Sequence, residues 1–147
     1  MSNGPFHAMA LLIKARLEAW PALEDVPVVI DLQKDITSEI GTAQAKATGC
    51  AITIFYEGDR DLTENLNPPR VTARYSVKCY GLPVVEDVNA DWIPAETAKA
   101  EVMKALHHWV PTDDNHNATE CKVQPGDLVP DRDFLIYEVP VEVPVQL

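Results

Sequence analysis

The sequence is poor in several residue types, and each shortage excludes a class of function. It contains three serines and six glycines, and neither a Gly-x-Ser-x-Gly motif nor a glycine-rich phosphate loop occurs. No apolar run approaches the roughly 18 residues of a transmembrane span, and the first residues lack the basic and apolar stretches of a signal peptide. We therefore expect a soluble protein made in the cytoplasm, without serine hydrolase or nucleotide-binding chemistry.

The cysteines are too few and too widely spaced for a disulfide framework or a zinc site. Cys50, Cys79 and Cys121 cannot all pair with one another. Thiols within apolar strand patterns are more often inert core residues than nucleophiles. We predict that all three are reduced and buried.

Basic residues are also scarce, with 12 lysines and arginines against 23 acidic residues and a net charge of −11. This field repels phosphate and argues against sequence-specific nucleic-acid binding. Residues 113–142 carry eight acidic and two basic side chains, which is −6 of the −11. A solvated surface is the preferred interpretation. The alternatives are an acidic face that meets a basic partner and a channel wall that DNA passes without binding.

One histidine-rich cluster has side chains that can bind metals. It consists of His107, His108, Asp113 and His116. Adjacent histidines on a helix point about 100° apart, and the spacing matches no zinc signature. We predict no metal and no cofactor, since a helix C-terminus favours histidine through its dipole. The alternative is a small metal-dependent enzyme that uses His107, His108 and His116.

Apolar periodicity predicts three helices and five strands within a single domain over residues 1–147. Residues 1–8 are left as a loose start. The helices are expected at Met9–Trp20, ended by Pro21; at Asp35–Gly49, closed by Gly49; and at Pro94–Trp109, ended by Pro111. The strands are expected at Val26–Leu32, Ala51–Tyr56, Arg70–Tyr80, Thr119–Gln124 and Asp133–Val143, with a Pro125-Gly126 turn before the last.

These elements indicate an α+β fold, with two or three helices packed on a mostly antiparallel mixed sheet of about five strands. In Arg70–Tyr80, apolar and polar residues alternate, as in a strand with one buried and one wet face. Its antiparallel neighbour is expected to be Ala51–Tyr56. In the last strand, Pro140 and Pro144 are an even number of residues apart, so both missing N–H groups should face one edge, which we expect to be a margin of the sheet.

Two features could contact other proteins. The segment Glu57–Pro69 is too long for a tight turn, and we expect a projecting loop that exposes Asp59, Arg60, Asp61 and Glu64. Trp20 and Trp109 each stand at the end of an apolar helix stripe. A tryptophan there most often packs the core, and a subunit contact is the alternative.

Four local patterns between about Met9 and Val143 resemble the tail terminator proteins of long-tailed bacteriophages. They are the helix that closes on Trp20-Pro21, the segment Asp31–Ile36, the helix Glu96–Trp109 with its Leu-His-His-Trp end, and the segment Phe134–Val139. The resemblance implies an α/β protein, not an enzyme, that forms a hexameric ring on the head-proximal end of the tail tube. Such a ring stops tube polymerisation and presents a surface to the head.

The partners that the resemblance implies are further copies of the chain, the tail tube protein and a head-completion or connector protein, with no membrane. Assembly would take place in the bacterial cytoplasm and the product would be part of the virion. The loop with Asp59, Arg60, Asp61 and Glu64 is the expected tube contact. A head-tail joining protein of the same virion and a host adaptor without a phage connection are the alternatives, because proteins of this size and fold class serve many functions.

Overall fold

The computed structural model describes residues 4–31, 45, 49–63, 65, 68–81, 93–111, 120–131 and 134–147. Within these residues the chain forms two α-helices, one short 3-10 helix and six strands. In chain order they are α1 (Pro5–Glu18), the 3-10 helix η1 (Pro21–Leu23), β1 (Val28–Asp31), β2 (Cys50–Arg60), β3 (Arg70–Gly81), α3 (Ala95–Leu106), β4 (Lys122–Val123), β5 (Leu128–Val129) and β6 (Leu135–Gln146).

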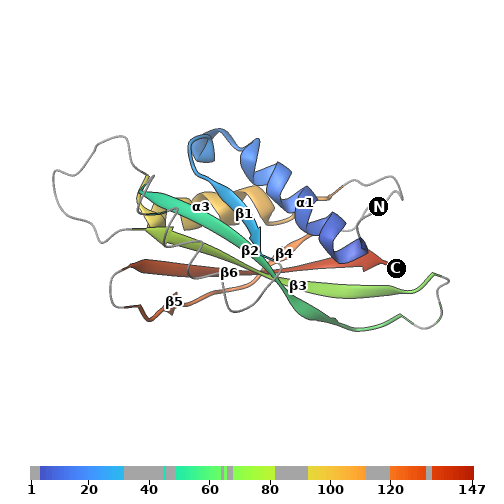
Figure 1. The fold of residues 1–147 in the computed structure, drawn as a ribbon. Helices are drawn as coiled ribbons and strands as arrows, with labels where there is room; N and C mark the ends of the chain where they lie inside the picture. The colour runs from blue at the N-terminus through green and yellow to red at the C-terminus, as the bar shows by residue number, and fades with distance from the viewer. Residues whose placement is uncertain are drawn as a thin grey trace.

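The strands form one sheet in the order β1-β2-β3-β6-β4, and β5 also pairs with β6. β1 is parallel to β2, and all other pairs are antiparallel. Both α-helices lie on one face of the sheet (Figure 1), which we call the helix face, and we call the opposite side the far face. The predicted α+β fold with a mostly antiparallel mixed sheet is confirmed, with six strands in place of about five.

Helix α1 begins four residues earlier than the sequence predicts. Pro5 occupies the first helical position after the N-cap Gly4, where its missing N–H costs no intrahelical bond. Residues 5–8 are therefore helical and not a loose start, and residues 1–3 lie outside the described part. The helix ends at Glu18, two residues before Trp20, and Pro21 opens the 3-10 helix η1. Neither described α-helix is long and apolar enough to cross a membrane.

The main core lies between the two helices and the helix face of the sheet. Alternate residues of β2, β3 and β6 point into it, because side chains of a strand alternate between the two faces of its sheet. Its fully buried side chains include Ile13, Leu17, Ile52, Ile54, Tyr75, Val77, Val102, Leu106, Val139 and Val141. The predicted alternation along β3 and its pairing with β2 are confirmed.

The far face is not wet along its whole length. Tyr80 is fully buried there in a second, smaller cluster with Ala45, Ala51 and Ile136. Ala45 belongs to the predicted helix Asp35–Gly49, most of which lies outside the described residues. Gly49 has φ of +85° and donates its N–H to the carbonyl of Ala45 at 2.7 Å. Both features are typical of a glycine at the C-terminal end of a helix.

A β-bulge extends the β2–β3 hairpin beyond its predicted end. Tyr56 pairs with Tyr75, but Gly58 pairs with Arg74, so Glu57 is an extra residue in β2. Gly58 has φ of +119°, which is strained for any residue with a Cβ atom. The ladder then continues to Arg60. The prediction of a loop over Glu57–Pro69 is therefore wrong for its first four residues. Gly58 and Asp59 have the composition of a turn, but they follow the bulge and remain paired with β3.

Both prolines of β6 direct their missing N–H groups away from β3, as predicted. The carbonyl of Pro140 accepts a hydrogen bond from the N–H of Gln124 at 2.9 Å, so Pro140 faces the β4 side, and Pro144 has the same parity. The expectation that this edge is a margin is wrong, because β4 and β5 pair with it in two short pieces. The gap between β4 and β5 falls opposite Pro140, which has no N–H to donate to a neighbouring strand.

Pro125-Gly126 does not reverse the chain as the predicted turn would. β4 and β5 run in the same direction, and Gly126 lies directly against β6 between them. A Cβ atom at this position would lie 1.9 Å from the carbonyl oxygen of Glu138. The close approach of two backbones, and not a turn, is therefore what requires glycine here.

We predict that Gly126→Ala lowers the free energy of unfolding by about 1–3 kcal/mol or more, because the added methyl group must displace the β6 backbone. Chemical denaturation followed by circular dichroism measures the change. Gly4→Ala is the control, since nothing lies within 4 Å of a Cβ atom there, and we expect a change below about 1 kcal/mol. Equal changes in the two variants would contradict the close packing at Gly126.

Candidate assembly surfaces

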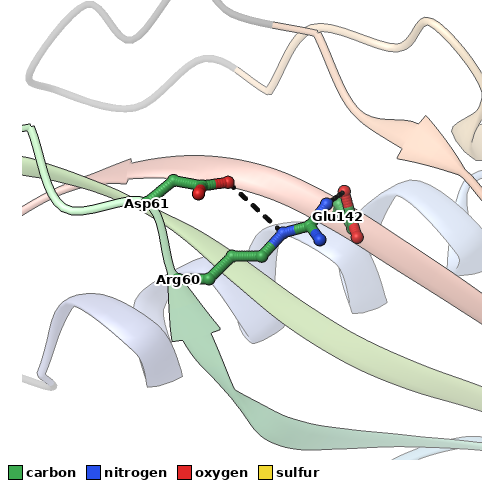
Figure 2. Close-up of polar contacts among 3 residues, drawn as sticks. All are labelled: Arg60, Asp61 and Glu142. Atoms are coloured by element: carbon green, nitrogen blue, oxygen red, sulfur yellow. Dashed lines mark hydrogen bonds and ion pairs between the residues drawn. The ribbon is translucent and has the colours of Figure 1, made fainter.

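Glu142 on β6 is linked to Arg60 of β2 on the far face of the sheet. Its Oε2 atom accepts a hydrogen bond from Nη2 of Arg60 at 2.6 Å, and Nε of Arg60 lies 3.3 Å from Oδ2 of Asp61. Because β3 lies between β2 and β6, the Arg60 side chain crosses β3 to reach Glu142 (Figure 2). The Glu142 side chain is 15% exposed, so this ion pair is better shielded than an ordinary surface pair.

Two further cations flank Glu142. Arg74 of β3 and Lys122 of β4 are its direct cross-strand neighbours, and both are exposed. Side chains that face each other across an antiparallel pair are within reach of one another. Among the described residues, neither Arg74 nor Lys122 forms an ion pair with a carboxylate. We call Arg60 and these two cations, together with the neighbouring carboxylates of Asp61, Glu120 and Glu142, the charged surface.

A hollow of about 280 Å³ opens beside this group, with Arg60 and Lys122 on its wall. Thr72 and Pro144 also line it, as do the acidic residues Asp61, Glu120 and Glu142. Of these acids, Glu142 is held by Arg60, and Glu120 lies 3.1 Å from Nδ1 of His108. The hollow is therefore lined by two cations and three carboxylates.

The structure separates the four predicted contact residues. Because the bulge shifts the parity of β2, Asp59 pairs with Ala73 on the helix face and Arg60 pairs with Thr72 on the far face. Both belong to the strand and not to a loop. Asp61 is exposed and has φ of +58°, at the start of the connection that follows. Glu64 lies outside the described residues.

Asp59 holds the bulge from the helix face. Its Oδ2 atom accepts a hydrogen bond from the hydroxyl of Tyr56 at 2.5 Å, across the extra residue. Burial and this bond raise the pKa of Tyr56 to about 12, so the hydroxyl remains a donor at any physiological pH. Tyr56 in turn stacks on Phe6 of α1, with ring centroids 4.7 Å apart. The base of the hairpin is thereby tied to the helical layer.

Trp20 and Trp109 both lie close to the guanidinium group of Arg16. The guanidinium carbon of Arg16 is 5.1 Å from the centroid of the Trp20 ring and 5.7 Å from that of Trp109. Its Nε–H donates to the carbonyl of Ala105 at 3.0 Å, near the C-terminus of α3. Both tryptophans are half-buried against the main core. These contacts place both rings in the packing of α1 against α3, the preferred interpretation of the two.

Glu101 completes this cluster on α3. Its carboxylate accepts hydrogen bonds from Nε1 of Trp20 at 2.8 Å and from Nζ of Lys104 at 3.2 Å. The bond from Trp20, followed by the bond from Lys104, holds the pKa of Glu101 below its ordinary value. Sequence could have suggested Arg16, which is four residues before Trp20 on one helix face. No sequence signal indicates Glu101, which is 81 residues from its tryptophan.

The histidine pair has a different geometry from the predicted one. α3 begins at Ala95 and ends at Leu106, so His107 and His108 follow the helix, and His108 has φ of +63°. Their ring centroids are 3.9 Å apart, and the rings do not diverge as they would on a helix. Nδ1 of His107 accepts the N–H of Val123 at 3.4 Å. Asp113 and His116 lie outside the described residues.

The three cysteines are the remaining reactive groups among the described residues, and each is buried. All three cysteines are free and buried, as predicted. Burial raises the pKa of Cys50 and of Cys121 to about 12, and that of Cys79 further, so each is held as a thiol. In the part of the chain that the structure describes, no three histidine, cysteine or acidic side chains are grouped as a metal site.

The fold has counterparts among solved structures. No protein-family model matches the chain, and no curated protein matches it. One similar structure is a chain in the virion of a native gene transfer agent (GTA) particle, with 12% sequence identity and a TM-score of 0.65. The likeness covers 99% of this chain and 100% of the matched chain. At this identity the likeness shows a shared fold.

We predict that Arg16→Lys lowers the free energy of unfolding by about 1–2 kcal/mol, since lysine cannot stack between the two rings while donating to Ala105. Urea titration followed by tryptophan fluorescence measures it. The matched control is Arg74→Lys, the same replacement at an exposed far-face position, which should change stability by less than about 0.5 kcal/mol. A loss no larger than that of the control would show that the stacking contributes nothing.

The lowered pKa of Glu101 predicts a pH dependence with a definite sign. A depressed carboxyl pKa contributes stability that is present above the ordinary value of about 4.5 and is lost as the pH falls through the folded-state pKa. The stability difference between the wild-type protein and Glu101→Gln should therefore be greatest near neutral pH and shrink below pH 4.5. Urea unfolding at several pH values measures it.

Proposed function

We propose that this protein is a structural component of a phage-like virion that closes a ring on the head-proximal end of the tail tube. The observation that carries the proposal is the end-to-end likeness of its fold to a chain of the gene transfer agent virion. The resemblance of four local patterns to tail terminator proteins supports the more specific role. In that role the ring ends tube polymerisation and offers a surface to the head.

The described side chains suit binding better than chemistry. The polar groups that the fold brings together link strands and helices, as Glu142 and Glu101 do. They form a rigid scaffold from which exposed side chains can contact partners over a broad surface. A ring requires a heterologous interface whose rotation closes, so the geometry of such surfaces would determine the activity.

The tip of the β2–β3 hairpin is the part that we assign to the tube. In Figure 1 the distal ends of β2 and β3 extend beyond the helical layer. Leu62 is 54% exposed there, next to the exposed carboxylate of Asp61. The N–H of Thr63 donates to the carbonyl of Arg70 at 2.8 Å, which holds this part of the connection to the ladder. Arg60, in contrast, serves the sheet through Glu142.

The proposal predicts that the purified protein, added to the polymerising tube protein encoded with it, yields tubes of limited length with a cap at one end. Negative-stain electron microscopy measures the length distribution and detects the cap. Long, uncapped tubes would contradict the role and would favour a joining protein that binds after the tail is complete.

The same assay tests the hairpin tip. Leu62→Asp with Asp61→Lys should reduce capping, because both changes alter exposed side chains at the proposed contact. Glu96→Gln, which makes the same net charge change on the exposed side of α3, should cap as the wild-type protein does. Equal capping by all three proteins would assign the tube contact to another surface.

A further inference from the structure

A pocket of about 250 Å³ opens at the edge of the sheet, where the end of β1 meets β2 and the start of α1. β1 is the first strand of the sheet order, so no other described strand lies beyond it. The pocket is lined by residues of these three elements: Phe6, His7, Ala10, Ile30, Asp31, Phe55 and Tyr56. None of them belongs to the hairpin tip or to the charged surface, so the pocket is a separate feature of the molecule.

Aromatic rings form much of the pocket wall. The rings of Phe6 and Tyr56 are stacked, with centroids 4.7 Å apart and planes 20° from parallel. The hydroxyl of Tyr56 donates to Asp59, which holds the Tyr56 ring in place. Phe55 adds a third ring and lies directly opposite Asp31 in the β1–β2 ladder. Because the faces of aromatic rings carry partial negative charge, this wall attracts cations.

Two further groups of the lining are hydrogen-bond acceptors. Asp31 carries a carboxylate and is 4% exposed. Nδ1 of His7 is shielded from solvent and forms no hydrogen bond with any described residue. Buried polar atoms without a partner are few in folded proteins, and each calls for an explanation. In the neutral imidazole that carries its proton on Nε2, Nδ1 accepts a hydrogen bond, so both groups suit a ligand that donates.

We propose that this pocket binds the ammonium group of a lysine side chain on a basic partner protein. An ammonium group has three N–H donors and no acceptor, which matches a carboxylate, an imidazole nitrogen and aromatic rings. It is also a compact point charge, whereas a guanidinium group needs acceptors placed side by side for its planar fork. The inference does not depend on the proposed ring.

Charge and size agree with this occupant. No lysine or arginine of the described residues lines the pocket. The net charge of −11 attracts a basic chain, and it repels a second copy of this protein as well as DNA. The butylammonium part of a lysine side chain has five non-hydrogen atoms, which fill about 150 Å³ at roughly 30 Å³ each. The pocket of about 250 Å³ therefore has room for it.

Nuclear magnetic resonance on the ¹⁵N-labelled protein tests the pocket with defined probes. The first probe is n-butylammonium chloride, and the second is a capped Gly-Lys-Gly peptide. Butan-1-ol and the same peptide with norleucine in place of lysine are the matched neutral probes. At equal ionic strength, both cations should give saturable shift changes at the amides of Phe6, His7, Phe55 and Tyr56. Their affinity should be roughly tenfold above that of the neutral probes.

Variants separate the charge of the pocket from its packing. Asp31→Asn keeps the side-chain shape and removes the charge, so it should weaken cation binding about tenfold and leave binding of the norleucine peptide unchanged. Phe55→Leu removes a ring and should weaken cation binding about threefold. Glu96→Gln is the control, since it removes the same charge from an exposed position on α3 and should bind as the wild-type protein does. Circular dichroism checks folding, and Phe55→Leu carries the test where Asp31→Asn does not fold.

Three results would overturn the inference. Equal binding of the lysine and norleucine peptides would show an apolar pocket without a preference for charge. Binding of n-butylammonium without binding of the lysine peptide would assign the pocket to a free amine and not to a protein. Absence of saturable shift changes with either cation would show that the pocket binds no ammonium group. None of these results bears on tube capping, so the proposed function is tested separately.

Discussion

The antiparallel ladder between β3 and β6 is the constraint on which the rest of the structure depends. It pairs twelve residues of each strand without a register shift, from Arg70 opposite Gln146 to Gly81 opposite Leu135. This register places one set of alternate side chains under both helices and the other set on the far face. A slip of one residue would move Glu142 into the core and Val141 into solvent. The core and the charged surface around Glu142 are thus two results of one register.

Much of this fold could be predicted from periodicity, since the buried stripes of α1, β3 and β6 recur at the spacing of a helix or strand. The errors fall where one sequence pattern permits two backbone structures. Gly58-Asp59 has the composition of a turn but continues the ladder after a bulge at Glu57, because the partner strand is long enough to pair with it. Pro125-Gly126 likewise has the composition of a turn but lies flat against β6. Only the neighbouring strand decides between these outcomes.

The candidate site was less predictable than the fold, for a physical reason. Arg60 and Asp61 were identified as exposed polar residues, but the role of Arg60 depends on Glu142, 82 residues later. The parity change at the bulge decides which face Arg60 occupies, and a single sequence does not reveal it. Trp20 and Trp109 pack against the main core, whereas the contacts that Arg16 and Glu101 make with them depend on how α1 crosses α3.

The prolines of β6 have a consequence for how copies of this protein can associate. A sheet edge with a full row of N–H and C=O groups offers any extended chain a place to pair, and such pairing has no inherent end. Pro140 and Pro144 interrupt that row, and β4 and β5 occupy part of what remains. Fewer backbone groups of this edge are then free to pair with the strand of another molecule. Open, fibrous association through this edge of the sheet is thereby disfavoured.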